Sequence, residues 1–414
     1  NDITLGGGGQ IQLNAAVSTT DAVRISTSGG VSQTASGTVT ANEFGVRNSG
    51  TGNIVLDQGN LVTTFAASSS ANGGTIQFTN AGSLTVGTIS SDGSLFASTD
   101  GITTNTGNVT IISSGTMTIG TGVGQFISAA GATVTLNAIT GGIAESAGSI
   151  VNADKLLLQG AGTFSLVESN TVGTLAAGIL GSLDYNDADD LSIGTVGTTN
   201  GITTGDGLTP GGSVTINTAG NLTVDQAIST AMGTGGLISV TNATLNAALI
   251  AGAGNITLTG GGQDLIINVD QTSNTTITYS ATRDIIIRAT ITANGGTSDI
   301  VMTADSDGNH VGGVWIDESG LADAQLVAGH DITLHGSDVF ATNGSLDSIR
   351  IDSDGANPQL QAGNNINLLA NGAAPANADI VVEGVVTATA GSITIDSAHE
   401  IQLAADQNAG LQIL

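Results

Sequence analysis

The chain of 414 residues carries a formal net charge of −28, from 34 acidic and six basic side chains. So few cations cannot neutralise a row of phosphates, which argues against a nucleic-acid partner or an anionic membrane surface. With 39% hydrophobic residues, three prolines and no run of 18 apolar residues, the composition also argues against disorder and against membrane insertion.

Short segments in which β-branched or aliphatic residues alternate with polar ones recur along the whole chain. Period-two alternation bounded by Gly, Asn, Asp or Ser predicts half-buried strands of three to five residues. No stretch shows a competing helical period. In chain order the predicted strands include 3–5, 10–13, 76–78, 84–86, 109–111, 117–119, 134–136, 214–216, 222–224, 256–258, 331–334, 365–368, 392–395, 400–403 and 411–414.

A longer repeat contains these strands. Residues 29–44 match 141–156 at an offset of 112 (141 − 29), 75–89 match 182–196 at 107 (182 − 75), and 108–120 match 213–225 at 105 (213 − 108). This predicts one region, 1–246, with two tandem copies at about 23–132 and 134–236. Residues 247–414 are expected to continue the architecture with longer loops, since Ile332, Ile366 and Ile401 follow one another at 34 and 35 residues.

The economical fold for such strands is an all-β parallel β-helix, a solenoid in which each strand pairs with its equivalent one turn away. Asn-Gly dipeptides, the mark of tight hairpins, are few for so many strands. Inward Val, Ile and Leu would then stack in apolar columns along an elongated rod, and outward Thr and Asn in polar ones. An array of β-sandwich modules remains the alternative.

Two segments resemble a known family. Gly-Asn-Ile-Thr-Leu-Thr-Gly at Gly254–Gly260 and Thr-Ala-Gly-Asn-Leu-Thr-Val at Thr218–Val224 are similar to the shaft repeats of filamentous-haemagglutinin-like bacterial exoproteins, of the two-partner-secretion type. The resemblance implies a right-handed helix, secretion to the bacterial cell surface, and a role in adhesion, biofilm matrix or fibre building. The secretion domain of that family carries Asn-Pro motifs, whereas the single Asn-Pro here is Asn357-Pro358, so this chain is expected to be shaft material.

Acidic clusters give the only cofactor candidate, which is calcium. Asp305, Asp307 and Asn309 alternate oxygen ligands as calcium loops do, although His310 stands where an EF-hand has Gly. Asp187 and Asp189, within the group that also holds Asp184 and Asp190, form a second candidate, for which a solvated acidic turn is the alternative. The first repeat has no carboxylates at these positions, which argues against catalysis, and the chain is expected not to be an enzyme.

The four histidines, His310, His330, His335 and His399, are scattered and are expected at the surface without a metal. The predicted function is a structural segment of an extracellular fibre that assembles end to end, either with copies of itself or with further repeats of the same chain. The expected assembly residues are Ile3, Leu5, Ile11, Leu13, Leu411, Ile413 and Leu414. The alternative is an adhesin or glycan-binding module that uses Trp315, Tyr279 and the loops at 305–317 and 337–354.

Overall fold

The computed structural model describes residues 1–122, 124, 126–206, 211–230, 236–251, 253–260, 264–318, 323–337, 347–353, 358–370, 378–404 and 407–413. Within these ranges every regular element is a β-strand, so the prediction of an all-β chain is confirmed. The chain divides into two compact units, Asn1–Thr204 and Gly205–Leu414.

The strands of the first unit vary in length from two to 19 residues. They are β1 (Ile3–Gly7), β2 (Ile11–Leu13), β3 (Val17–Ser18), β4 (Ala22–Thr27), β5 (Val31–Gln33), β6 (Val39–Asn48), β7 (Ile54–Asn72), β8 (Ile76–Asn80), β9 (Leu84–Val86), β10 (Thr88–Ile89), β11 (Thr99–Asp100), β12 (Ile102–Asn105), β13 (Val109–Ser113), β14 (Met117–Ile119), β15 (Phe126–Ala138), β16 (Ile143–Glu145), β17 (Ile150–Gly160), β18 (Phe164–Ile179), β19 (Leu183–Asp187), β20 (Leu191–Ile193), β21 (Thr195–Val196), β22 (Thr199–Asn200) and β23 (Ile202–Thr204).

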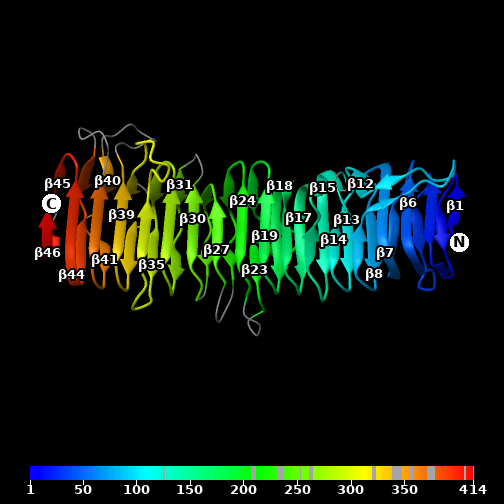
Figure 1. The fold of residues 1–414 in the computed structure, drawn as a ribbon, viewed down its shortest axis with the longest axis horizontal. Coiled ribbons are helices and arrows are strands. Elements are labelled where there is room, and N and C mark those ends of the chain that lie inside the picture. Colours follow the sequence, from blue (N-terminus) through cyan, green and yellow to red (C-terminus); the bar gives the residue numbers. More distant parts are fainter. Residues whose placement is uncertain are drawn as a thin grey trace. The chain divides into compact units, whose positions relative to one another are not determined.

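Parallel pairing joins these strands into columns, a column being a set of strands linked by successive pairings. One column runs β2, β5, β7, β8, β13, β15, β17 and β18. Strands β7, β15, β17 and β18 are long because each continues around a bend and takes part in a second column, as β7 does when it also pairs with β6. Neighbouring strands of the unit lie side by side in Figure 1.

Two short antiparallel hairpins interrupt the parallel pattern of the first unit. One is β10–β11 and the other β21–β22. The first hairpin buries Phe96 against Ala66 and Ile89, and the second buries Val196 against Leu157 and Ala176. Each hairpin therefore covers a small residue on the outer side of a parallel strand.

The second unit is built from shorter strands. They are β24 (Val214–Thr218), β25 (Leu222–Val224), β26 (Ile228–Ser229), β27 (Ile238–Thr241), β28 (Ala243–Leu245), β29 (Leu249–Ile250), β30 (Ile256–Gly260), β31 (Leu265–Ile267), β32 (Gln271–Ser273), β33 (Ile277–Ala281), β34 (Ile285–Ile287), β35 (Thr290–Ala293), β36 (Ile300–Thr303), β37 (Val314–Ile316), β38 (Gln325–Ala328), β39 (Ile332–Gly336), β40 (Asp347–Ile351), β41 (Pro358–Ala362), β42 (Ile366–Ala370), β43 (Asp379–Val382), β44 (Val385–Ser397), β45 (Ile401–Leu403) and β46 (Gln407–Ile413).

Over most of this unit each strand pairs in parallel with the strand three places further on. The pairings β30–β33, β33–β36, β36–β39 and β39–β42 make one column, and β31–β34, β34–β37, β37–β40 and β40–β43 make a second. The predicted equivalence of Ile332 and Ile366 is confirmed by their direct pairing. That of Ile366 and Ile401 is wrong, because Ile366 pairs with Ile393 and Ile401 pairs with Ile380 in another column.

The core is formed by the inward half of each alternating strand. Since side chains point to opposite faces at successive positions, paired strands in register place aliphatic residues directly above one another. In the second unit the fully buried stack includes Ile256, Leu258, Ile277, Tyr279, Ile300, Met302, Ile332, Leu334, Ile366 and Leu368. Most of the few aromatic residues are also interior, and the rings of Phe65 and Phe78 stack with centroids 3.9 Å apart.

Turns between strands also stack, and they do so through glycine. A Cβ on Gly329 would lie 2.0 Å from the carbonyl oxygen of Gly295, and one on Gly363 would lie 2.1 Å from that of Gly329. Such contacts are far inside van der Waals distance, so only glycine allows the backbones of these successive turns to approach. The neighbouring Gly296, by contrast, has open space where its Cβ would be.

This difference gives a matched pair of substitutions. Gly329→Ala should lower the free energy of unfolding by about 1–3 kcal/mol, because the added methyl forces the stacked backbones apart. Gly296→Ala should leave it within about 0.5 kcal/mol. Chemical denaturation followed by far-UV circular dichroism measures both, and equal effects of the two substitutions would contradict the stacked-turn geometry.

Candidate functional site

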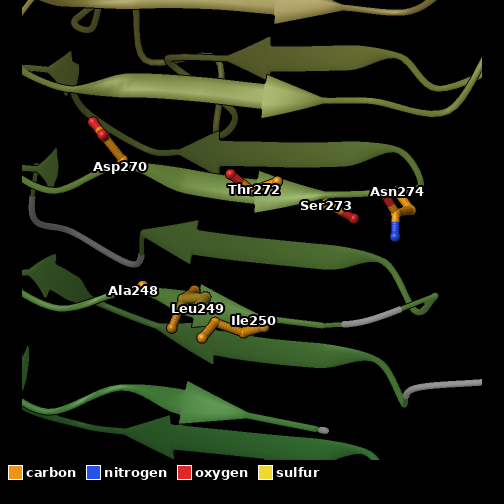
Figure 2. Close-up of a pocket in the computed structure, with 7 residues that line it drawn as sticks. All are labelled: Ala248, Leu249, Ile250, Asp270, Thr272, Ser273 and Asn274. Atoms are coloured by element: carbon orange, nitrogen blue, oxygen red, sulfur yellow. The ribbon is translucent and has the colours of Figure 1, made fainter. Parts of the chain in front are cut away.

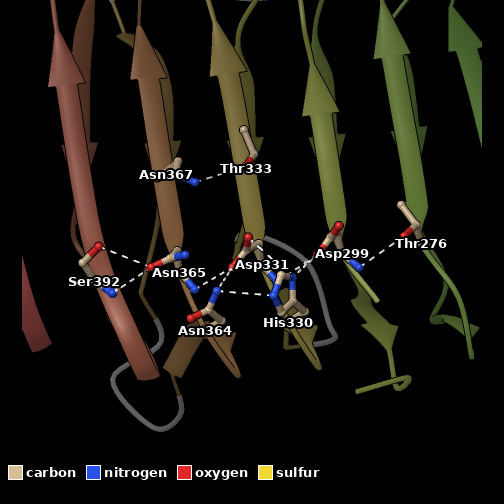
Figure 3. A network of polar contacts seen from close by, with 9 residues as sticks. All are labelled: Thr276, Asp299, His330, Asp331, Thr333, Asn364, Asn365, Asn367 and Ser392. Atoms are coloured by element: carbon tan, nitrogen blue, oxygen red, sulfur yellow. Dashed lines mark hydrogen bonds and ion pairs between the residues drawn. The ribbon is translucent and has the colours of Figure 1, made fainter. Parts of the chain in front are cut away.

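A ladder of polar residues, each directly before a buried isoleucine of its column, lies in the second unit (Figure 3). The backbone N–H of Asp331 donates to Asp299 Oδ1 at 3.0 Å, and that of Asn365 donates to Asp331 Oδ1 at 2.7 Å. The backbone N–H of Ser392 continues the series by donating to Asn365 Oδ1 at 3.1 Å. Each side chain therefore satisfies a backbone donor of the next strand in the column.

His330 is held beside two carboxylates of this ladder. Its Nδ1 lies 2.8 Å from Asp299 Oδ1 and 3.5 Å from Asp331 Oδ2. All three side chains are half-buried. The hydrogen bond to Asp299 raises the pKa of His330 above its ordinary value, because the carboxylate stabilises the imidazolium.

A second group with the same arrangement lies in another column. Asp379 begins β43, and Glu400 directly precedes β45, the strand that pairs with β43. The Nδ1 of His399 lies 2.5 Å from Asp379 Oδ1, and the backbone N–H of Glu400 donates to the same oxygen at 3.2 Å. In each of the two triads, the three possible ligand atoms lie within 4.8 Å of one another.

The sequence did not predict these triads. His330 and His399 are expected at the surface without a metal, because the histidines are scattered and no third ligand accompanies them at zinc spacing. Their carboxylate partners Asp299 and Asp379 are distant along the chain. The available signal was the repeated pattern Asp-Ile followed later by His-Asp-Ile or His-Glu-Ile, at 299–300 with 330–332 and at 379–380 with 399–401.

The predicted calcium loop at Asp305, Asp307 and Asn309 is an exposed turn whose oxygens bond to the turn itself. Both carboxylate oxygens of Asp305 accept the backbone N–H of His310, at 3.1 and 3.2 Å. Asp307 Oδ2 accepts the amide of Asn309 at 3.0 Å, and Asn309 Oδ1 accepts the N–H of Val311 at 2.9 Å. The bond from Val311 to Asn309 is that of an Asx turn, and calcium binding here stays a prediction.

The other predicted calcium candidate, Asp187, belongs to the interior. Its side chain is 1% exposed, so the solvated-turn interpretation is wrong for this residue, while Asp184, Asp189 and Asp190 are exposed. Asp187 follows Leu183 and Tyr185 on the inward face of β19. Its Oδ2 accepts the Tyr185 hydroxyl at 2.8 Å and the backbone N–H of Val172 at 3.2 Å.

A second carboxylate, the half-buried Glu145, lies close to it. Glu145 Oε2 accepts the Asn170 amide at 3.3 Å and the backbone N–H of Glu168 at 3.0 Å, whereas Glu145 Oε1 is buried without a hydrogen-bond partner among the described residues. Burial raises the pKa of Glu145 to about 7 and that of Asp187 to about 7. Burial also raises the pKa of Tyr185, with the Asp187 charge adding to the effect.

The same network in the first repeat copy contains no carboxylates. Asn60 Oδ1 accepts the backbone N–H of Val39 at 2.8 Å, as Asn170 Oδ1 accepts that of Val151 at 2.7 Å. Around this shared amide, the aligned residues differ in charge. The first copy has Gln33, Phe78 and Asn80 where the second has Glu145, Tyr185 and Asp187.

The predicted assembly residues at the start of the chain lie on strands with one recorded partner each. Among the described residues, β1 pairs with β4, β2 with β5 and β3 with β6. Ile3 and Leu5 are part-exposed, although their register partners Val23 and Ile25 are fully buried. Leu411 and Ile413 pair with Ile393 and Ile395, and Leu414 lies outside the described residues.

The surface expected for glycan binding is only partly described, because residues 338–346 and 354 lie outside the described ranges. The expectation that Tyr279 contacts a glycan is wrong, since its side chain is fully buried. Trp315 is part-exposed, and its indole N–H donates to Asp352 Oδ2 at 2.8 Å. Burial of Tyr279 follows from its inward position on β33.

A shallow pocket of about 350 Å³ lies elsewhere in the second unit, between β29 and β32 (Figure 2). Its lining includes Leu249, Ile250, Asp270 and Thr272. The one carboxylate in this lining is engaged, because Asp270 Oδ1 accepts the backbone N–H of Thr290 at 2.9 Å. The pocket thus offers a small apolar hollow without paired acid and base groups.

No family model, curated protein or solved structure matches the chain. Among the described residues there is no helix with the length and apolarity that a membrane span requires.

The charge difference between the two copies predicts opposite pH effects for two exchanges. The pKa of Glu145 is raised from 4.5 to about 7, so the folded state binds the proton more tightly than the unfolded state does. Stability is therefore lost as pH rises from about 4.5 to about 7, and the loss is complete above that range. Glu145→Gln should raise the free energy of unfolding at pH 8 by about 1–3 kcal/mol and change it little at pH 4.

Gln33→Glu is the reverse exchange at the aligned position, and it should destabilise the chain at pH 8 more than at pH 4. Urea denaturation at the two pH values measures both variants. A Glu145→Gln variant whose gain in stability is the same at both pH values would show that burial of the charge is not the cause.

Proposed function

We propose that each unit is a segment of a right-handed parallel β-helix and that the chain is a structural segment of an extracellular or cell-surface bacterial fibre. Successive 414-residue segments of the fibre would join end to end by β-pairing. The next turn of helix is supplied either by a second copy or by further repeats of the same chain.

The observation that carries the proposal is the parallel pairing of each strand with an equivalent strand further along the chain. In the second unit β30, β33, β36, β39 and β42 pair in register through Ile256, Ile277, Ile300, Ile332 and Ile366. A chain that returns repeatedly to the same column in parallel has coiled, and parallel crossovers are right-handed in nearly all proteins. β-Sandwich modules are built from antiparallel pairs, which the described residues show in the two hairpins and one isolated bridge.

Support for end-to-end assembly comes from β1, β2 and β3. A strand with one partner offers a second row of backbone donors and acceptors, which readily accepts another strand. The inward side chains Ile3 and Leu5 would become as buried as Val23 and Ile25 once another turn stacked on them. That stacking would bury apolar surface and complete the backbone pairing at the same time.

Support for an extracellular role comes from the family resemblance and from composition. The two segments that resemble shaft repeats of exoproteins form β25 and β30, whose inward residues Leu222, Val224, Ile256 and Leu258 belong to the core columns. The chain contains no cysteine, so its stability does not depend on the redox state of its surroundings. A net charge of −28 keeps a glycine-rich surface soluble at high local concentration.

End-to-end association through β1 can be tested by placing charged side chains on that strand. The double variant Ile3→Lys with Leu5→Lys should fold, since both positions are part-exposed, but it should not associate. Stacking another turn would bury two ammonium groups without partners. Sedimentation velocity and negative-stain electron microscopy across a concentration series should show end-to-end oligomers of the native chain and at least tenfold weaker association of the variant.

Leu61→Lys is the matched control, because Leu61 is 52% exposed on β7, a strand paired on both sides. It should associate like the native chain. Far-UV circular dichroism checks that all three proteins are folded. If the 414-residue chain stays monomeric throughout the concentration series, its first strands do not accept a further turn and the assembly proposal is wrong. The proposal is equally wrong if the edge variant associates as strongly as the unsubstituted 414-residue chain.

A further inference from the structure

We propose that the triad Asp299, His330 and Asp331 and the triad Asp379, His399 and Glu400 are two binding sites for divalent transition-metal ions of the zinc class. Each site would supply one imidazole nitrogen and two carboxylate oxygens, and would leave coordination positions open for water. The open positions make these sites able to accept an external ligand.

The distances in the first triad match a shared ion. Ligand atoms that bind one zinc ion at about 2.1 Å lie roughly 3.0–3.5 Å apart in tetrahedral or octahedral geometry. His330 Nδ1 lies 2.8 Å from Asp299 Oδ1 and 3.5 Å from Asp331 Oδ2. All three ligand atoms lie within 4.8 Å of one another, so small side-chain movements would bring them to coordination distance from one ion.

The carboxylates of this triad are fixed in position by the backbone. Asp299 and Asp331 directly precede Ile300 and Ile332, which pair across β36 and β39. The Oδ1 atom of Asp331 accepts the backbone N–H of Asn365 at 2.7 Å and the amide of Asn364 at 2.9 Å, so that Oδ2 is turned toward His330. Hydrogen bonds of this kind orient carboxylate ligands and reduce the entropy lost when an ion binds.

The second triad repeats the same backbone arrangement, with Asp379 buried and with His399 and Glu400 exposed. Asp379 and Glu400 directly precede Ile380 and Ile401, which pair across β43 and β45, and His399 precedes Glu400 as His330 precedes Asp331. The two triads lie in different columns and share no residue. In both triads one imidazole nitrogen and two carboxylate oxygens lie within 4.8 Å of one another, and two carboxylates this close attract a cation.

The ligand set selects the class of ion. Calcium and magnesium prefer ligand sets made entirely of oxygen, whereas an imidazole nitrogen favours zinc, nickel, cobalt or copper. The strongly negative chain raises the local concentration of any divalent cation, but only a nitrogen ligand distinguishes the transition metals. Zinc is accordingly the probe of choice, and calcium is the comparison ion.

The test is isothermal titration calorimetry of the metal-stripped chain with zinc chloride at pH 7.5. The native chain should bind two zinc ions, and His330→Gln and His399→Gln should each retain one. In the double variant both sites should weaken by at least about 100-fold, because each has lost its only nitrogen ligand. Calcium chloride added before the titration should not lower the affinity of either site for zinc.

Two controls separate these sites from general binding to histidine or acidic side chains. His335→Gln changes a histidine of β39 that belongs to neither triad, and Asp305→Asn changes a carboxylate of the exposed turn. Both should bind two zinc ions as the native chain does, while Asp299→Asn should weaken one site at least tenfold. Visible absorption of cobalt-loaded protein reports the ligand geometry without reference to affinity.

The proposal is overturned if the double variant binds zinc with the stoichiometry and affinity of the native chain, or if His335→Gln loses a site. These measurements are made on the monomeric chain at low concentration. They therefore give the same answer whether or not the chain assembles into a fibre.

Discussion

Every feature of this protein depends on parallel backbone pairing in register between successive strands of a column. The pairing fixes the spacing of neighbouring strands at about 4.8 Å, and it places inward side chains beside inward ones and outward side chains beside outward ones. Inward aliphatic residues then pack on one another along the column, as Ile256, Ile277 and Ile300 do, and no large side chain is needed at a common centre. A shift of one residue would turn the apolar face outward, so the alternation and the hydrogen bonds select the same register.

The fold could be predicted from sequence as far as local patterns determine it. Triplets such as Ile76-Gln77-Phe78 place two side chains inward and one outward, and the structure has them so. The partner of each strand was harder to predict, because turns differ in length. Ile332 and Ile366 pair as their spacing suggested, but Ile366 pairs next with Ile393, across a shorter interval than the one before. The alternation of apolar and polar residues therefore predicts which side chains of a strand point inward, but it does not predict the length of the turn that follows.

The candidate sites were predicted less well, and for two different reasons. For Asp187, the acidic segment around it suggested calcium binding or a solvated turn, although its alternation with the inward residues Leu183 and Tyr185 places it in the core. The histidine triads could not be read from spacing at all. Asp299 and His330 are adjacent only because β36 and β39 pair, and the number of residues between paired strands differs from turn to turn. Long-range ligand sets of this kind require the register to be known.

Stacking also explains where new chemistry arises in such a fold. A residue that precedes an inward strand lies one strand spacing from its equivalents, close enough for carboxylates and imidazoles on adjacent strands to share an ion. In one ladder, Thr276 and Asn365 fill this position with neutral groups that accept a backbone N–H of the next strand, whereas Asp299 and Asp331 fill it with charge. One added histidine, His330, converts that part of the ladder into a set of metal ligands. Because in-register pairing places these residues side by side, such a conversion needs substitutions only at the positions that precede the paired isoleucines and no change in the core.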